Sequence, residues 1–171
     1  MELSKRERTI KYCVYAIIIA ICALLQNVSG LFLQIGEARC FLLVPVAVLL
    51  SLDEDEKSAA LLGLFAGLLW DCVSAHHMGF NSIYIMLACY VSALLVNRLF
   101  RATYWVGYVG AVIFTLLYCV LYWVLFVAFK GGDGAVSSLI EFYLPSFVYT
   151  CVVALPLNLL LVPLRKRLNK S

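Results

Sequence analysis

Residues 104–129 read YWVGYVGAVIFTLLYCVLYWVLFVAF, a run without a single charged side chain. As a helix rising about 1.5 Å per residue, this run is long enough to cross the roughly 30 Å hydrocarbon core of a bilayer. The whole chain has a similar bias, with 64% hydrophobic and 13% charged residues. Soluble domains have about 45–50% hydrophobic residues and about 25% charged residues. A small chain cannot bury so much apolar surface, so the sequence predicts an all-α integral membrane protein.

Polar or turn-forming residues divide the chain into six apolar segments of one domain, residues 1–171. The expected spans are 10–28, 31–52, 58–73, 79–96, 104–129 and 142–164. We therefore expect a bundle of about six transmembrane helices. The second and third segments are short for a bilayer, which leaves five spans open as an alternative.

The basic residues are distributed unevenly between the two sides of this bundle. With the N-terminus in the cytoplasm, eleven of the 13 Lys and Arg fall inside, and only Arg39 and Lys130 fall outside. This bias follows the positive-inside rule, so both termini are predicted to be cytoplasmic. The acidic run from Asp53 to Glu56 falls in a cytoplasmic turn. It is expected to be solvated, with docking of a basic partner as the alternative.

No pattern indicates an enzyme, a metal site or a cofactor. The seven cysteines are scattered and never paired by a short spacing. Adjacent His76 and His77, even with Asp71, supply too few ligands for a metal. The nucleophile-elbow and zinc-protease motifs are absent. We expect no catalytic residue, no metal, no cofactor and no nucleic-acid partner.

The third segment carries a stripe of small residues. Ala59, Gly63 and Gly67 recur every four residues, and this spacing lets membrane helices approach closely. The favoured interpretation is a contact between two helices of this chain. A contact with another protein is the alternative.

Asp71 is the next residue along the same stripe. A carboxylate among apolar neighbours is costly against lipid, so we expect it to be buried and compensated. Ser74 and Gly79 belong to the turn that follows and are expected to be structural. The candidate partners of Asp71 are Arg39, Lys130, His76, His77 and the backbone amides of residues 74–79.

Aromatic residues repeat every four positions in the fifth segment, at Phe114, Tyr118, Tyr122 and Phe126. Such a series lies on one helix face. Packing inside the bundle is the favoured interpretation. A membrane helix of a partner protein is the alternative occupant of this face.

The residues from Ala60 to Asp71 read ALLGLFAGLLWD, and Ser74 and then Met78-Gly79-Phe80-Asn81 follow. This region resembles the bacterial rod shape-determining protein MreD family, which has a Gly-x-x-x-Gly-Leu-x-x-Asp helix, a short Ser-containing turn and a further span. The basic start, the proline in the last span and the basic tail agree with that family. Ala75 departs from its pattern, as do the two histidines of the turn.

The resemblance implies a non-enzymatic scaffold subunit of the cell-wall elongation (rod) complex in the bacterial inner membrane. Such a subunit determines cell shape through the bitopic protein MreC, the MreB filament and the peptidoglycan synthases. It also implies a bundle similar to the substrate-binding subunits of energy-coupling-factor transporters.

A substrate-binding subunit of a vitamin transporter is the alternative, and it would differ by a polar, aromatic-lined cavity opening outward. Gln26, Tyr84, Asn81 and Asn97 are too dispersed in the sequence to establish one. The sequence also leaves open which helices bind partners, and in what stoichiometry.

Overall fold

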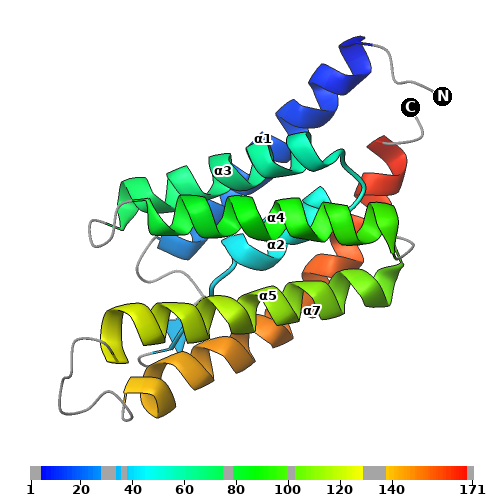
Figure 1. Cartoon of the computed structure of the whole chain (residues 1–171). Helices are drawn as coiled ribbons and strands as arrows, with labels where there is room; N and C mark the ends of the chain where they lie inside the picture. Colours follow the sequence, from blue (N-terminus) through cyan, green and yellow to red (C-terminus); the bar gives the residue numbers. More distant parts are fainter. Residues whose placement is uncertain are drawn as a thin grey trace.

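The computed structural model describes residues 5–27, 34–35, 38–74, 79–99, 103–128 and 138–168. The elements are α1 (Lys5–Asn27), β1 (Gln34–Ile35), β2 (Ala38–Arg39), α2 (Leu43–Ser51), α3 (Glu56–Val73), α4 (Phe80–Arg98), α5 (Tyr104–Trp123), η1 (Val124–Ala128), η2 (Leu139–Tyr143) and α7 (Leu144–Leu168). Both η1 and η2 are single π-helical turns. The turn η1 continues α5, and the turn η2 precedes α7. Apart from one antiparallel hairpin, whose strands have two residues each, the described chain is a helical bundle (Figure 1).

Four helical stretches are long and apolar enough to cross a membrane. They are Lys5–Asn27, Phe80–Arg98, Tyr104–Val127 and Leu139–Leu168. Large apolar side chains such as Leu24, Ile83 and Leu160 are well exposed on these helices, as expected of a surface that faces lipid. The prediction of an all-α, multi-pass membrane bundle is confirmed at this level.

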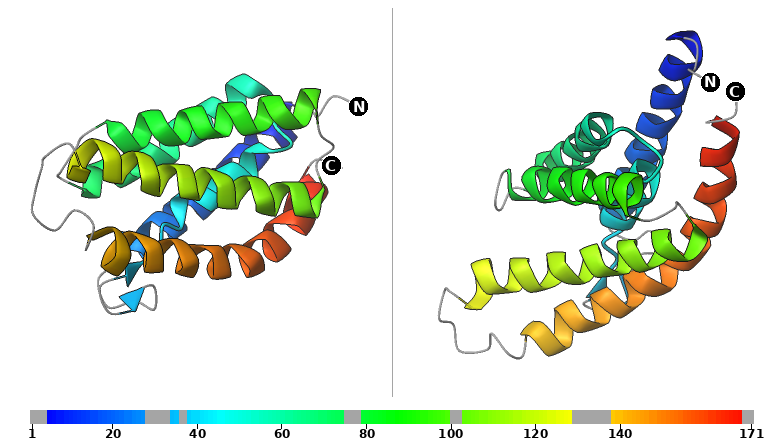
Figure 2. Two further views of the ribbon diagram at one scale, coloured as in Figure 1. Left: turned by 60° about the horizontal axis from the view of Figure 1, so that its bottom comes forward. Right: turned by 45° about the vertical axis from the view of Figure 1, so that its right-hand side comes forward.

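The helices pack in two pairs around α2. Figure 2 shows α3 beside α4 in both views, and α5 beside α7. Helix α2 lies between the pairs and contacts α3, α4, α5 and α7, while α1 packs against α2 and α3. The first residues of α1 and the last residues of α7 lie at the same end of the bundle (Figure 1).

The segment expected as a span from 31 to 52 folds differently. Its described part is the β1–β2 hairpin followed by α2, whose nine residues are all buried. Such a helix is about 14 Å long, roughly half of the hydrocarbon core. Because α2 is enclosed by other helices, its hydrophobic run forms the centre of the core.

The backbone that leads into α2 is not helical, and its amide groups need partners inside the bundle. Side chains of neighbouring helices supply them. The Arg39 amide donates to Ser146 Oγ at 3.0 Å, and the Phe41 amide donates to Thr150 Oγ1 at 3.0 Å. The Leu43 amide donates to Gln26 Oε1 at 2.9 Å. These bonds fix the segment from Arg39 to Leu43 against α1 and α7.

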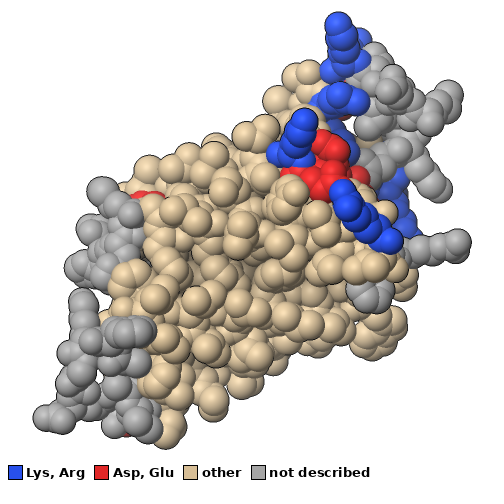
Figure 3. Space-filling model, viewed as in Figure 1, with Lys and Arg blue, Asp and Glu red and all other residues tan. Residues whose placement is uncertain are grey.

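Most of the charged side chains seen in Figure 3 gather at the end of the bundle where α1 begins. Lys11 forms a salt bridge with Glu54, and both side chains are buried. The Tyr12 hydroxyl donates to Glu54 Oε2 at 3.2 Å. Arg165 donates to the Leu49 carbonyl oxygen at 2.6 Å.

The expectation of a solvated acidic turn is therefore wrong for Glu54, which is 4% exposed. Helix α1 covers the turn and brings the Lys11 ammonium to the carboxylate. Burial raises the pKa of Glu54, and the hydrogen bond and charge of Lys11 act in the opposite direction. This pair ties α1 to the α2–α3 turn.

Candidate functional site

The two glycines of α3 lie directly against the backbone of α4. A Cβ atom at Gly63 would lie 2.6 Å from the Ile85 carbonyl oxygen, and one at Gly67 would lie 2.7 Å from the Asn81 carbonyl oxygen. Ala59, on the same stripe, is fully buried. Because α4 fills the space beside Gly63 and Gly67, these two positions have no room for a partner helix.

Asp71, 6% exposed, caps the N-terminus of α4 with its carboxylate. It accepts hydrogen bonds from the Gly79 amide at 3.1 Å and the Ser82 amide at 2.9 Å. The Asn81 side-chain amide donates to it at 2.9 Å, and the Ser82 hydroxyl also donates to it. The first amides of a helix have no partner within the helix and favour negative charge, which explains how this acid is compensated.

Only one of the partners expected for Asp71 is among these donors, the amide of Gly79. Arg39 forms no ion pair with it within the described residues. His76, His77 and Lys130 lie outside the described residues. The donors from Asn81 and Ser82 were missed, although a polar residue in the first turn of a helix is a signal for such a contact.

Ser74 and Gly79 flank the described ends of the α3–α4 connection. The Ser74 hydroxyl donates to the Trp70 carbonyl oxygen at 3.0 Å and accepts from the Asn81 amide at 3.3 Å. Gly79 has a φ of 95°, a conformation that glycine adopts far more readily than other residues. We call Asp71, Ser74, Gly79, Asn81 and Ser82 the Asp71 network.

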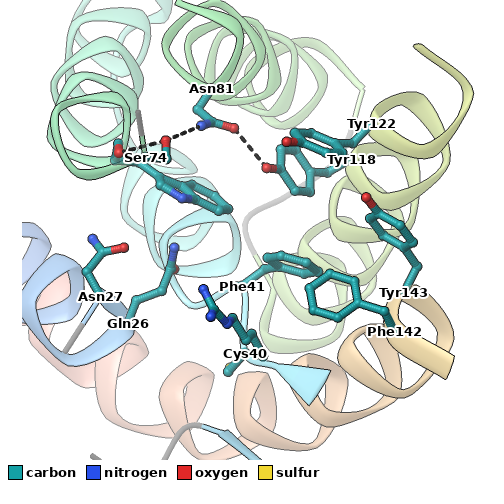
Figure 4. Close-up of a pocket in the computed structure, with 12 residues that line it drawn as sticks. Gln26, Asn27, Cys40, Phe41, Ser74, Asn81, Tyr118, Tyr122, Phe142 and Tyr143 are labelled. Atoms are coloured by element: carbon teal, nitrogen blue, oxygen red, sulfur yellow. Dashed lines mark hydrogen bonds between the residues drawn. The ribbon is translucent and has the colours of Figure 1, made fainter. Parts of the chain in front are cut away.

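The network continues to α5 through one hydrogen bond. The Tyr118 hydroxyl donates to Asn81 Oδ1 at 2.8 Å, as the dashed line in Figure 4 shows. Because Asn81 also donates to Asp71 Oδ1, three helices are joined by these three side chains. Every one of the three is buried.

The aromatic series, which lies on α5 and η1, faces the interior. Tyr118 is 3% exposed and its ring contacts Trp70 and Phe41. Tyr122 and Phe126 pack against Phe80 of α4.

The carbonyl oxygen of Phe114 accepts from the Tyr84 hydroxyl at 2.6 Å. The alternative of a partner face on the aromatic series therefore does not hold for Tyr118, which is buried inside the bundle. Spacing defines a face but not its direction. The exposed face of α5 carries Ile113, Leu116, Leu117 and Val120 instead.

A cavity of about 320 Å³ lies at the bundle end opposite the charged cluster. Half of its lining is aromatic: Phe41, Trp70, Tyr118, Tyr122, Phe142 and Tyr143. The rest is Gln26, Asn27, Arg39, Cys40, Ser74 and Asn81. We call this space the aromatic cavity (Figure 4).

Gln26 and Asn81, far apart in the sequence, meet at the aromatic cavity. The other two dispersed polar residues do not. Asn97 donates to the Glu54 carbonyl oxygen at the charged end, at 3.2 Å, and Tyr84 bonds to α5. Within the described residues, no cluster of three His, Cys, Asp or Glu side chains is placed to hold a metal ion.

Comparison with known proteins adds one finding. No curated protein and no solved structure matches the chain. The family model described as rod shape-determining protein MreD matches residues 7–168. The match includes the Gly63 and Gly67 stripe, the Asp71 network and the aromatic cavity. The chain therefore belongs to the rod shape-determining protein MreD family.

Proposed function

We propose that this chain is a non-enzymatic scaffold of the cell-wall elongation complex. It would determine cell shape by binding an MreC-like bitopic protein and, with it, an MreB-like filament and the peptidoglycan synthases. The observation that carries this proposal is the family match over residues 7–168, since the family has a rod shape-determining role.

The use of the buried polar groups supports a structural role. The Asp71 carboxylate accepts four hydrogen bonds, and the Asn81 side chain bonds to Asp71, Ser74 and Tyr118. A general base or nucleophile needs a lone pair or proton within reach of a substrate. These groups instead join α3, α4 and α5 into one unit, as a scaffold requires.

The exposed apolar helices are the proposed partner surface. The outward residues of α1, α4, α5 and α7 include Ile17, Leu87, Ile113 and Val152. Helix association in a membrane depends on close packing and hydrogen bonds, because lipid is as apolar as the helix surface. A single membrane helix of a bitopic partner would pack along one of these faces.

We propose that the charged end of the bundle faces the cytoplasm. Lys11 and Arg165 lie there with the first residues of α1 and the last residues of α7, in accord with the positive-inside rule. With both ends on one side, the chain crosses an even number of times. The proposal counts six crossings, with α3 as the third and the short α2 as part of the second. The aromatic cavity then opens toward the outer side.

The same proposal includes a fold similar to that of the substrate-binding subunits of energy-coupling-factor transporters. The aromatic cavity is the one observation that favours the alternative, a vitamin transporter subunit. A transporter subunit and a scaffold differ in what they bind within the membrane, and a crosslinking experiment separates them.

The test places a photo-crosslinking amino acid at one exposed position per helix, namely Ile17, Leu87, Ile113 and Val152, in the native bacterium. Buried Tyr118 serves as the control position. The proposal predicts crosslinks to an MreC-like protein from one helix face and none from Tyr118. Crosslinks from all four faces to a transporter's energising subunits, and none to an MreC-like protein, would reject it.

A further inference from the structure

We propose that the aromatic cavity binds a small ring compound that carries a carboxylate group. This inference rests on the lining of the cavity and not on the proposed scaffold role. It concerns binding at the end of the bundle opposite the charged cluster and requires no transport step.

The aromatic wall supplies the surface for a ring. The ring centroids of Phe41, Trp70 and Tyr118 lie 5.2–6.0 Å apart, and the planes of Phe41 and Tyr118 are tilted by about 30° from that of Trp70. Ligand pockets of proteins are about 300–1,000 Å³ and are mostly apolar and aromatic with few polar groups. The cavity of about 320 Å³ therefore suits a compound of one or two rings.

Two hydrogen-bond donors of the cavity lining, on Gln26 and Arg39, are left available. Gln26 Oε1 accepts from the backbone amide of Leu43. The side-chain nitrogen of Gln26 therefore points away from Leu43. In the described parts of the chain, neither this nitrogen nor the Arg39 guanidinium has a hydrogen-bond or ion-pair partner. Two unused donors, one of them a cation, favour an acceptor that carries negative charge.

Among the described residues that line the cavity, none carries a carboxylate to compete for these donors. Asp71 lies behind Asn81 and is not among the residues that line the cavity. The hydroxyl of Tyr118 and the side chain of Asn81 bond to each other, so they contribute shape and not charge. Among the described lining residues, Arg39 is thus the only charged side chain, and a guanidinium pairs well with carboxylate and phosphate.

The test measures binding of matched probes to the purified full chain in lipid nanodiscs by titration calorimetry. Indole-3-acetate, tryptophol and tryptamine share one ring system and differ in charge. N-acetylmuramate and N-acetylglucosamine are the corresponding anionic and uncharged saccharides. These two arms distinguish an aromatic from a saccharide source of the same anionic ring chemistry.

We expect at least one anionic probe to bind about tenfold or more tightly than its uncharged counterpart, as one charge-assisted hydrogen bond provides. Arg39→Gln should remove this preference while the melting temperature stays unchanged. The matched control is Arg98→Gln, which replaces an exposed cation in the last turn of α4 and should keep the preference.

Several outcomes overturn the inference. One is the absence of binding by all five probes at about 10 mM, weaker than most recognised metabolite sites. Another is equal binding of charged and uncharged probes. A third is an Arg39→Gln variant that keeps the anion preference. None of these results bears on cell shape, so failure of this site and failure of the scaffold role are distinguishable.

Discussion

Replacing Gly67 by alanine tests the close contact between α3 and α4. The added methyl group would lie 2.7 Å from both the Asn81 carbonyl oxygen and the Ser82 amide nitrogen, whereas an ordinary contact begins at about 3.4 Å. Both atoms belong to the α4 backbone, so no side chain can rotate away. Helix α4 must move by several tenths of an ångström.

The magnitude follows from two opposed effects. Overpacking costs about 1–3 kcal/mol of stability. A shift of Ser82 also weakens its hydrogen bond to Asp71, and a buried polar group left unpaired costs about 1–3 kcal/mol more. Alanine regains about 1 kcal/mol of helix propensity over glycine. The net loss is about 3 kcal/mol, which corresponds to roughly 6–12 °C in the melting temperature of a chain of this size.

The assay is thermal unfolding of the purified protein in detergent, with Gly110→Ala as the matched control. A Cβ atom at Gly110 meets nothing within 4 Å, so this variant should melt at or slightly above the wild-type temperature. If Gly67→Ala melts within about 2 °C of wild type, less than the shift of about 1 kcal/mol in a chain of this size, the contact is not as close as described. An equal loss in Gly110→Ala would show a general intolerance of alanine instead.

Three further groups of substitutions, at Asp71, at the Lys11–Glu54 pair and at Gly79, are tested by the same melting assay. Asp71→Leu should lose about 3–5 kcal/mol of stability because it leaves several α4 donors unpaired. Asp71→Asn should lose about 2 kcal/mol because it keeps one acceptor oxygen. Equal melting temperatures of both variants and the wild type would contradict the capping role. Lys11→Met should lose about 3 kcal/mol by leaving Glu54 buried without its cation, and adding Glu54→Gln should restore most of it; additive losses would argue against the pair. Gly79→Ala should lose about 1–2 kcal/mol through its positive φ, and Gly79→Asn less; an Asn variant as unstable as the Ala variant would contradict a conformational cause.

Local patterns of the sequence predicted the features that depend on few residues. The uncharged run of residues 104–129 indicated a membrane helix, because length and hydropathy alone decide that question. The four-residue spacing of Gly63 and Gly67 predicted close helix packing for the same reason. Both features are visible in one segment of the chain.

Features that depend on distant segments were not predictable in this way. The pairing of Glu54 with Lys11 arises because α1 folds over the α2–α3 turn. The nine residues of α2 are as apolar as a membrane span, and only the surrounding helices make them a core helix. The aromatic cavity likewise collects residues from six elements, so Gln26 and Asn81 gave no local signal of their proximity.

The central claim is that this chain supports rod shape through lateral wall synthesis. The most direct test is depletion of the protein in its native bacterium, with imaging of cell outlines and of a fluorescent wall precursor. The scaffold role predicts cells that become round and whose lateral wall labelling is dispersed or lost. Depleted cells that stay rod-shaped with normal lateral labelling, and that acquire a vitamin requirement, would contradict it and favour the transporter subunit.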